Sequence, residues 1–372
     1  MKSMSKSALK INENSSEPLI LAVDTSCDET SVAILRGRNV ITSIVSSQTE
    51  LHKKWGGIVP HVARRAHEEN LPKAYAEAMK RAGIDDPKQF DAVAVTKGPG
   101  LAVDLEVGID FIKQLAINEN IPLIEVNHME GHFLSSLALN SEGHGSIEDF
   151  NEDEYFPALG LLVSGKHTEI VYSEKIGQYK KIGWTLDDAA GEAFDKFGRM
   201  MGFGYPAGPV VSEFAKKGKP NDLIELPIPL EKSKDLNFSY SGLKTASLYR
   251  INELREQGLK DKDFANDFCY AFVQVIVDSI VLKLEKALQG YPEAKSVFAG
   301  GGVLKNEKLS RSLSNMVRSY GVKFNLPDDK YRTDNAVMIG IVAYYKYLRG
   351  EISTTTEQKS RLDRNPRLEI GN

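Results

Sequence analysis

The distribution of apolar and polar residues along the chain predicts one α/β pattern that occurs twice. In the first copy, PLILAVDT, TSVAILRG and NVITSIVSSQ are short and rich in β-branched residues, which predicts a three-stranded meander. Residues 59–83 then carry helical spacing, 90–96 form a buried-strand run, 101–118 are helical, and 121–127 form a second buried strand that leads into a histidine-containing helix. The predicted order is βββαβαβα.

The pattern restarts after an acidic loop, NSEGHGSIEDFNEDEYFP. ALGLLVSG, HTEIVYSE and QYKKIGWT predict three more strands. A helix over 186–202 and a long helix over 264–290 follow, then a strand at 295–301, a helix, a strand at 322–327 and a last helix from about Thr333. Two copies of one α/β unit imply two facing domains with a cleft between them.

This duplicated order resembles the superfamily of actin, the Hsp70 ATPase domain and the sugar kinases, the ASKHA fold of two RNase H-like domains. The resemblance implies that nucleotide binds in the interdomain cleft. It also implies that the turn between the first two strands of each copy faces the phosphates. Here those turns are DTSCDET (24–30) and SGKHTE (164–169). Such a resemblance concerns the fold and does not fix a reaction.

The pattern also sets the expected boundaries. We expect a first domain over 18–140, completed by a C-terminal helix at about 333–349. A second domain is expected over 155–330, with an insert at about 203–245. The ends of the chain are expected to be a disordered leader over 1–17 and a flexible tail over 351–372.

Composition narrows the class of protein. With 372 residues and 41% hydrophobic residues the chain can bury two cores, and a formal charge of −4 means that nucleic acid must bind through a local basic patch or a partner's surface. The two cysteines, Cys27 and Cys269, provide no disulfide framework and no Cys-rich metal site. No apolar run has the length of a membrane span, and the leader contains no arginine. A cytoplasmic location is therefore expected, and a mitochondrial one less so.

The stretch EVNHMEGHFLSSLAL (125–139) contains the first candidate chemistry. His128 and His132 are four residues apart, which on a helix places both imidazoles on one face, one turn apart, as two ligands of one metal ion require. A single histidine on an apolar face is usually a hydrogen-bonded core residue, and a pair at this spacing can also be a solvated helix edge. The stretch alone leaves both interpretations open.

Glycines mark candidate anion sites. GLLVSGKHT (160–168) nearly spells a Walker A loop through Gly160, Gly165 and Lys166, but a histidine follows the lysine and the next segment is a strand. The better interpretation is a tight β-turn in which backbone N–H groups and the hydroxyls of Ser164 and Thr168 approach an anion, with a plain structural hairpin as the alternative. TKGPGLAVDLEVG and AGGGVLKN place further glycines at strand–helix junctions, which suit a phosphate or a carboxylate.

Nine motifs in order resemble one family. They are DTSCDETSVAI, GGIVPHVARRAH, GPGLAVDLEVG, NHMEGH, LLVSGKHT, DDAAGEAFDKFGRMMGFGYPAGP, FSYSGLKTA, GGVLKN and RTDNAVMIG, between about residues 19 and 348. Together they resemble the tRNA threonylcarbamoyladenosine transferases of the TsaD type. The resemblance implies transfer of threonylcarbamoyl from threonylcarbamoyl-AMP to the exocyclic amine of the adenosine 3′ of the anticodon in ANN-decoding tRNAs.

The resemblance also implies the site residues. His128, His132 and Asp334 would hold one divalent metal ion, iron or zinc, although Asp334 could instead cap a helix. Contacts with the adenylate are implied for Leu162, Val163, Ser164, Gly165, Lys166, Asp195, Gly208 and Asn306. The alternative for Asp195 is a helix-surface charge and for Asn306 a helix cap. No catalytic residue is assigned, because no Ser-His-Asp or Cys-His arrangement occurs and direct attack by the amine needs neither.

The chain departs from the family pattern at five positions. Lys166 replaces a glycine, and its ammonium can grip the phosphate or crowd it, with backbone strain if the turn needs a positive φ. The others are His61 for glutamate, Asp104 for a small residue, Ala207 for glycine and Arg332 for cysteine. Several changes near one cleft raise the prospect of altered or weakened activity.

The resemblance implies tRNA as a partner, and for bacterial relatives a paralogous subunit and an ATPase subunit, whereas mitochondrial relatives act alone. Basic residues that can contact phosphates, or can simply be solvated, are Lys53, Lys54, Arg64, Arg65, Lys359, Arg361, Arg364 and Arg367. Three rival functions remain: a non-catalytic adenylate-binding scaffold, a sugar-kinase-like phosphotransferase, and a metallopeptidase. HMEGH is not HExxH, because Glu130 follows His128 by two residues and points off the metal face.

Overall fold

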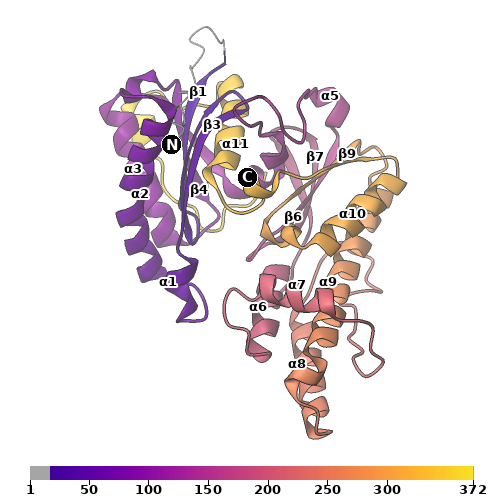
Figure 1. Cartoon of the computed structure of the whole chain (residues 1–372). Coiled ribbons are helices and arrows are strands. Elements are labelled where there is room, and N and C mark those ends of the chain that lie inside the picture. Colours follow the sequence, from indigo (N-terminus) through magenta and orange to yellow (C-terminus); the bar gives the residue numbers. More distant parts are fainter. Residues whose placement is uncertain (1–16, 372) are drawn as a thin grey trace, which may run out of the picture.

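A computed structural model of the chain describes residues 17–371 (Figure 1). The leader expected over 1–17 lies outside the described residues up to residue 16. The chain forms two five-stranded sheets, one in each half of the sequence. We refer below to the first sheet with its helices as the first half and to the second sheet with its helices as the second half.

The first sheet has the order β3-β2-β1-β4-β5. Its strands are β1 (Leu19–Asp24), β2 (Glu29–Arg36), β3 (Asn39–Ser47), β4 (Ala92–Gly98) and β5 (Leu123–Asn127). The first three form the predicted antiparallel meander, and β4 and β5 extend it in parallel. All residues of β1 are buried because helices cover both faces of the sheet at its centre.

The helices of the first half are α1 (Thr49–Lys53), α2 (Pro60–Ala82), α3 (Ala102–Asn118), α4 (His128–Leu134), α11 (Ala336–Leu348) and α12 (Thr356–Ser360). Helices α2 and α3 pack on one face of the sheet, and α11 packs on the other. Because α11 is apolar on nearly every side, it lies buried against the first sheet and against α4.

The second sheet repeats the connectivity with the order β10-β9-β6-β7-β8. Its strands are β6 (Ala158–Val163), β7 (Thr168–Lys175), β8 (Gln178–Trp184), β9 (Ser296–Gly300) and β10 (Lys323–Asn325). The meander β6–β8 is antiparallel, and β9 and β10 continue from β6 in parallel. The duplicated α/β order predicted from the sequence is confirmed, and with it the ASKHA fold class.

The helices of the second half are α5 (Glu152–Tyr155), α6 (Ala190–Met200), α7 (Gly208–Lys217), α8 (Ser241–Glu256), α9 (Asp261–Gly290) and α10 (Glu307–Ser319). The sequence did not predict α7 and α8, which lie in or next to the expected insert. Among residues 17–371, no helix is long and apolar enough to cross a bilayer. We keep 18–140 and 155–330 as proposed domain limits.

The C-terminal segment corrects an expectation, because residues 351–371 do not form a flexible tail. They pack along the first half, where the Lys359 side chain is fully buried and its ammonium donates to the Ala116 carbonyl at 3.1 Å. Leu362 and Ile370 are buried as well. The segment reads as polar, but these widely spaced apolar side chains and a capping box on α12 fix it to the surface.

Candidate functional site

His128, His132 and Asp334 meet where the two halves adjoin. The His128 Nε2 and His132 Nε2 atoms lie 3.6 and 3.1 Å from Asp334 Oδ1. The two imidazoles are on one face of α4, with ring centroids 4.8 Å apart. The sequence therefore predicted correctly that the two histidines share a helix face, and the structure adds that Asp334 faces both.

Helix α4 is short and is held from three sides. The Asn127 side chain caps it by accepting the amides of Met129 and Glu130 at 2.8 and 3.3 Å. Gly131 lets α11 approach, because a Cβ there would lie 3.1 Å from the Met338 side chain. Gly300 likewise lets β9 approach α4, because a Cβ at this position would lie 2.2 Å from the His132 carbonyl. Both sheets therefore fix the position of the histidines.

His128 is oriented by the turn DTSCDET (24–30) between β1 and β2, the first of the two turns expected to face the phosphates. Its Nδ1 shares a hydrogen bond with the Ser26 hydroxyl at 3.1 Å and lies 3.5 Å from Asp24 Oδ1. Asp24 itself accepts hydrogen bonds from Thr96 at 2.6 Å and from Ser26 at 3.2 Å. A carboxylate behind a histidine is the arrangement that fixes the tautomer and raises the basicity of a metal ligand. Nothing in the sequence of this turn indicated a role for Asp24 and Ser26 behind His128.

The electrostatics of the three residues are strongly coupled. Burial alone would lower the pKa of His128, but Asp334 and Asp24 raise it to about 10. Burial acts to raise the pKa of Asp334, yet the two histidines hold it well below its usual range. Nearby His167 has its pKa lowered to about 3 by burial and by the positive charges of His128 and His132.

The residues fit a metal ion. Their ligand atoms all lie within 4.8 Å of one another. Bonds of about 2.0–2.1 Å to a tetrahedral ion separate two ligand atoms by about 3.3 Å, close to the observed spacings. Within residues 17–371, His132 is buried and neither ring nitrogen makes a hydrogen bond, although imidazole nitrogens are normally satisfied when buried. Two neutral imidazoles and one carboxylate form a donor set suited to zinc or iron.

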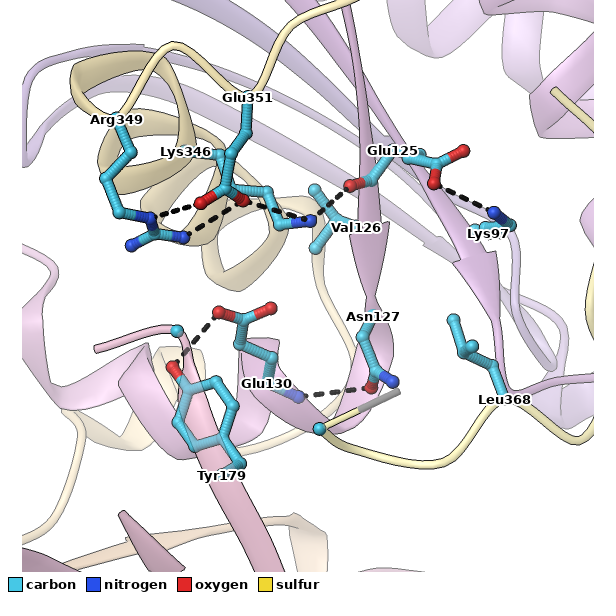
Figure 2. A pocket seen from close by; sticks show the side chains of 12 residues that line it. Lys97, Glu125, Val126, Asn127, Glu130, Tyr179, Lys346, Arg349, Glu351 and Leu368 are labelled. Carbon is cyan, nitrogen blue, oxygen red and sulfur yellow. Dashed lines mark hydrogen bonds and ion pairs between the residues drawn. The ribbon is translucent and has the colours of Figure 1, made fainter. Parts of the chain in front are cut away.

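Glu130 lies on the opposite face of α4, as predicted. It accepts a hydrogen bond from the Tyr179 hydroxyl at 3.0 Å and is buried at the edge of a polar cavity of about 230 Å³ (Figure 2). Burial raises the pKa of Glu130. Because its carboxyl group points away from both histidines, Glu130 does not stand where the general base of a metallopeptidase would.

Asp334 does not cap α11. The cap is Asn335, whose side chain accepts the amides of Val337 and Met338 at 2.9 and 3.3 Å. One residue before the cap, the backbone of Asp334 is still outside the helix, so its carboxylate is free to face the histidines. The capping alternative raised from the sequence is therefore wrong for Asp334.

The second phosphate-facing turn is a tight hairpin between β6 and β7, so the Walker interpretation is correctly rejected. The Ser164 amide donates to the His167 carbonyl at 2.8 Å, and the Ser164 hydroxyl accepts the amides of Lys166 and His167 at 3.4 and 3.2 Å. Thr168 is fully buried and its hydroxyl accepts the Ala190 amide at 2.9 Å. In this arrangement Gly165 and the Lys166 side chain are the exposed parts of the turn.

The adenylate contacts implied for Leu162 and Val163 cannot come from their side chains. Both side chains are fully buried, Val163 in the core of the second half and Leu162 in the cluster shared with the first half, and their backbone is paired within the sheet. Gly301 packs against this strand end, because a Cβ there would lie 2.3 Å from the Val163 carbonyl. Only backbone atoms after the last β6–β7 pair, Val163 with Thr168, remain available to contact a ligand.

Asp195, Gly208 and Asn306 are brought together by hydrogen bonds. Asp195 accepts the Ala207 amide at 2.8 Å, just before α7 begins at Gly208. The Asn306 side chain donates to the Ser212 hydroxyl at 3.0 Å, and Ser212 donates to the Gly208 carbonyl at 2.9 Å. Asn306 also accepts the Leu309 amide and so caps α10, while burial raises the pKa of Asp195. These three positions therefore form one cluster between α6, α7 and α10.

Lys166 is not strained. The non-glycine residues with a positive φ in the described chain are Asn120 and Leu230, so the lysine occupies the turn without cost. Its ammonium lies near the Cys27 thiol, which counteracts in part the rise in the cysteine's pKa caused by burial. The two phosphate-facing turns therefore approach each other through Cys27 and Lys166, a meeting that the sequence did not reveal.

The other departures differ in their surroundings. Asp104 is fully buried, neither of its carboxylate oxygens has a hydrogen-bond partner among residues 17–371, and burial raises its pKa to about 7. Ala207 is buried with its methyl group packed where Gly198 lacks a side chain. Arg332 is paired with Asp329 at 2.6 Å, and His61 is exposed. Asp104 is thus the departure with the largest expected energetic effect.

Solved structures with a similar fold support the architecture alone, because their sequence identity is low. HypF from T. kodakarensis superposes with a TM-score of 0.58 at 15% identity, over 92% of this chain and 49% of HypF. A full-length HypF in a phosphate- and nucleotide-bound form gives a TM-score of 0.55 at 13% identity, over 89% of this chain and 56% of that protein.

The sequence matches are closer. Residues 39–341 match the family model described as TsaD, tRNA N6-adenosine threonylcarbamoyltransferase. The enzyme of that name from Carboxydothermus hydrogenoformans is 41% identical over 334 residues, which cover 90% of this chain and 93% of the relative. The one from Clostridium perfringens is 39% identical over 360 residues, which cover 95% of this chain and 98% of the relative.

Proposed function

This chain belongs to the TsaD family of tRNA N6-adenosine threonylcarbamoyltransferases, and from that premise we propose how its residues divide the reaction. The enzyme forms threonylcarbamoyladenosine in tRNA. We propose that the donor is threonylcarbamoyl-AMP and the acceptor is the exocyclic amine of the adenosine 3′ of the anticodon in ANN-decoding tRNAs. The cluster of His128, His132 and Asp334 carries this proposal, because its ligand atoms converge and, among residues 17–371, the buried His132 ring nitrogens have no hydrogen bond.

We place one divalent metal ion, iron or zinc, on His128, His132 and Asp334. When bound, it supplies a Lewis acid that polarises the carbamoyl group and orients the threonyl part. Asp24 and Ser26 hold the His128 ring so that Nε2, 3.6 Å from Asp334, faces the site. The buried surroundings of α4 exclude water and strengthen each of these contacts.

The adenylate is proposed to lie on the second half. Its α-phosphate would face Gly165 and the Lys166 ammonium, and backbone groups at Leu162, Val163 and Ser164 would line the same turn. Asp195, Gly208 and Asn306 would bind the ribose and base, supported by the hydrogen bonds that join these three positions. A positive charge at Lys166 stabilises the negative charge that collects on AMP as it leaves.

The proposed partners follow from membership of the TsaD family. We propose that the chain works with a paralogous subunit and an ATPase subunit, as bacterial relatives of this family do, in the cytoplasm. The basic residues first considered for tRNA are largely neutralised: Arg64 pairs with Glu68 and Glu106, and Arg65 with Glu69. Arg364 also pairs with Glu106. Lys359 is buried, so the remaining free cations matter most.

The test is transfer of labelled threonine from freshly prepared threonylcarbamoyl-AMP into an unmodified ANN-decoding tRNA, with and without the partner subunits. We expect labelled tRNA whose digest releases threonylcarbamoyladenosine. A tRNA with cytidine in place of the target adenosine is the matched control. Label in the control, or none in the wild-type tRNA even with the partner subunits, contradicts the proposed donor or acceptor.

A further inference from the structure

A short segment that joins the two halves exposes a tryptophan beside a lysine that has no ion pair among residues 17–371. Trp55 is 59% exposed, and the Lys54 ammonium lies 5.2 Å from the centre of its ring. Leu51, on the preceding helix α1, is 47% exposed. Lys53 pairs with Glu50 at 2.5 Å, whereas Lys54 has no ion pair among residues 17–371. A large apolar ring and a free cation stand together in solvent, and packing within the chain accounts for neither.

The segment is anchored at the cleft. At its start, the Gln48 amide donates to the carbonyl of Asp28, in the first phosphate-facing turn, at 2.8 Å. Beyond Trp55, the Arg199 guanidinium of α6 donates to the Gly56 carbonyl at 2.7 Å, which joins the two halves. Arg199 is one helical turn from Asp195, so it shares that residue's face of α6. In Figure 1, α1 and α6 occupy the same end of the two halves.

The second tryptophan provides an internal comparison. Trp184 is 41% exposed, and the Lys181 ammonium lies 5.5 Å from its ring. Lys181, however, is paired with Glu369 at 2.6 Å and lies 3.9 Å from Glu169. The two sites therefore share an aromatic ring and a lysine, but only the one at Trp55 has a positive charge that is free for an anion.

We infer that Trp55 and Lys54 form a contact for the anticodon loop of the tRNA, in which Trp55 stacks on an unpaired base next to the target adenosine and Lys54 contacts a phosphate. This inference rests on the proposed acceptor. An adenosine beside the anticodon must leave its stack before its amine can enter the cleft, so a neighbouring base loses a stacking partner. An exposed indole at the rim replaces that partner, and stacking of this kind tolerates any base.

The direct test uses fluorescence. The chain has two tryptophans, so a Trp184→Phe variant leaves Trp55 as the sole indole. Titration with the anticodon stem-loop of an unmodified ANN-decoding tRNA should quench its emission. A fully paired RNA duplex of equal length and charge is the control, because it offers phosphates but no unpaired base, and it should leave the emission unchanged.

The kinetic test uses Trp55→Ala, Trp55→Phe and Lys54→Ala, with Trp184→Ala as the matched control. For Trp55→Ala we expect KM for tRNA to rise about ten-fold, partial rescue by Trp55→Phe, and unchanged affinity for the adenylate. Lys54→Ala should reduce the salt dependence of tRNA affinity by about 0.7 in the slope of log K against log salt, as loss of one phosphate contact predicts. Trp184→Ala should leave KM for tRNA unchanged.

The outcomes separate this inference from the proposed function. If wild type transfers threonylcarbamoyl but Trp55→Ala keeps its KM and Trp55 emission does not respond to the stem-loop, the inference is overturned and the function stands. If Trp55→Ala instead weakens binding of the paralogous subunit without changing tRNA affinity in its absence, the surface belongs to a protein partner and the inference is likewise overturned. Inactivity of wild type contradicts the function itself.

Discussion

The two phosphate-facing turns occupy equivalent places in the duplicated fold and differ in almost every contact. In the first, Asp24, Thr25 and Ser26 are at most 2% exposed, and their side chains bond to Thr96, His128 and the backbone of α3. In the second, Ser164 bonds within its own hairpin, and Gly165 and Lys166 are exposed. Duplication gave two similar turns, of which one now supports the histidine helix α4 and the other is the one that we propose to meet the adenylate.

The strongest way to break this comparison is to remove a histidine from α4, the helix that the first turn supports through His128. His132→Ala should abolish metal binding and lower the transfer rate about a thousand-fold, because several kcal/mol of charge stabilisation are lost. Metal content by mass spectrometry and tRNA labelling measure the two effects. His144→Ala is the matched control, since His144 is exposed and paired only with Glu148. Full metal content in His132→Ala would remove this residue from the site.

Asp24→Asn tests whether the first turn acts through His128. The amide cannot hold the ring as the carboxylate does, so we expect metal affinity to fall about ten- to a hundred-fold. Competition with a chelating dye measures it without any activity assay. Ser164→Ala, in the equivalent turn, should leave metal affinity unchanged. Equal losses in both variants would end the distinction between the turns.

Asp104→Ala tests the buried carboxylate beneath the first turn and keeps the backbone carbonyl of residue 104, which accepts the Thr25 hydroxyl. Burial raises the pKa of Asp104 from 3.8 to about 7, so the folded chain binds the proton more tightly. The protonated Asp104 side chain therefore contributes its full stabilisation below about pH 4, and this contribution is lost as the pH rises to about 7. The free energy of unfolding changes by up to about 4 kcal/mol over this range.

The alanine variant avoids the cost of burying an ionised carboxylate, but the cavity that it leaves offsets part of this gain. We therefore expect the free energy of unfolding of Asp104→Ala to exceed that of wild type by about 1–2 kcal/mol at pH 8 and not to exceed it at pH 5. Denaturant unfolding at the two pH values measures the difference. The same change in stability at both pH values would show that ionisation of Asp104 is not the cause.

Lys166→Gly should have the smallest effect, confined to the second turn. One ammonium beside a phosphate contributes about 1 kcal/mol, so affinity for AMP should fall about five-fold at low salt and by less at high salt. Calorimetric titration at two salt concentrations measures this. Metal affinity should not change, because the Lys166 amide and not its side chain bonds to Ser164. Tighter AMP binding in the variant would show that the lysine crowds the phosphate.

The sequence predicted elements whose signal is local. Strands of the two meanders are runs of β-branched residues, and the two histidines of α4 are close in sequence, so periodicity placed both correctly. The last helix was found because its residues are nearly all apolar. Helices α7 and α8 were not predicted, because Gly, Pro and polar residues in and around them interrupt the helical spacing of apolar residues.

Contacts between residues far apart in the sequence could not be predicted from local patterns of apolar and polar residues. Asp24 lies 104 residues before His128, and nothing in the turn DTSCDET indicates that it faces an imidazole. Likewise, Lys359 looks like one more charged residue of a polar tail, although it is buried against α3. The resemblance to a family supplied Asp334, but only the packing of α11 explains why Asn335 caps the helix and leaves Asp334 free.

The position of Asp334 on the chain has a consequence for synthesis. The two histidines leave the ribosome about 200 residues before the carboxylate that faces them, which at about 5–20 residues per second is a delay of about 10–40 s. During that interval α4 lacks α11, which later packs against α4 at Gly131. A nascent chain that has not reached Asp334 therefore lacks one of the three side chains that we propose to hold the metal ion.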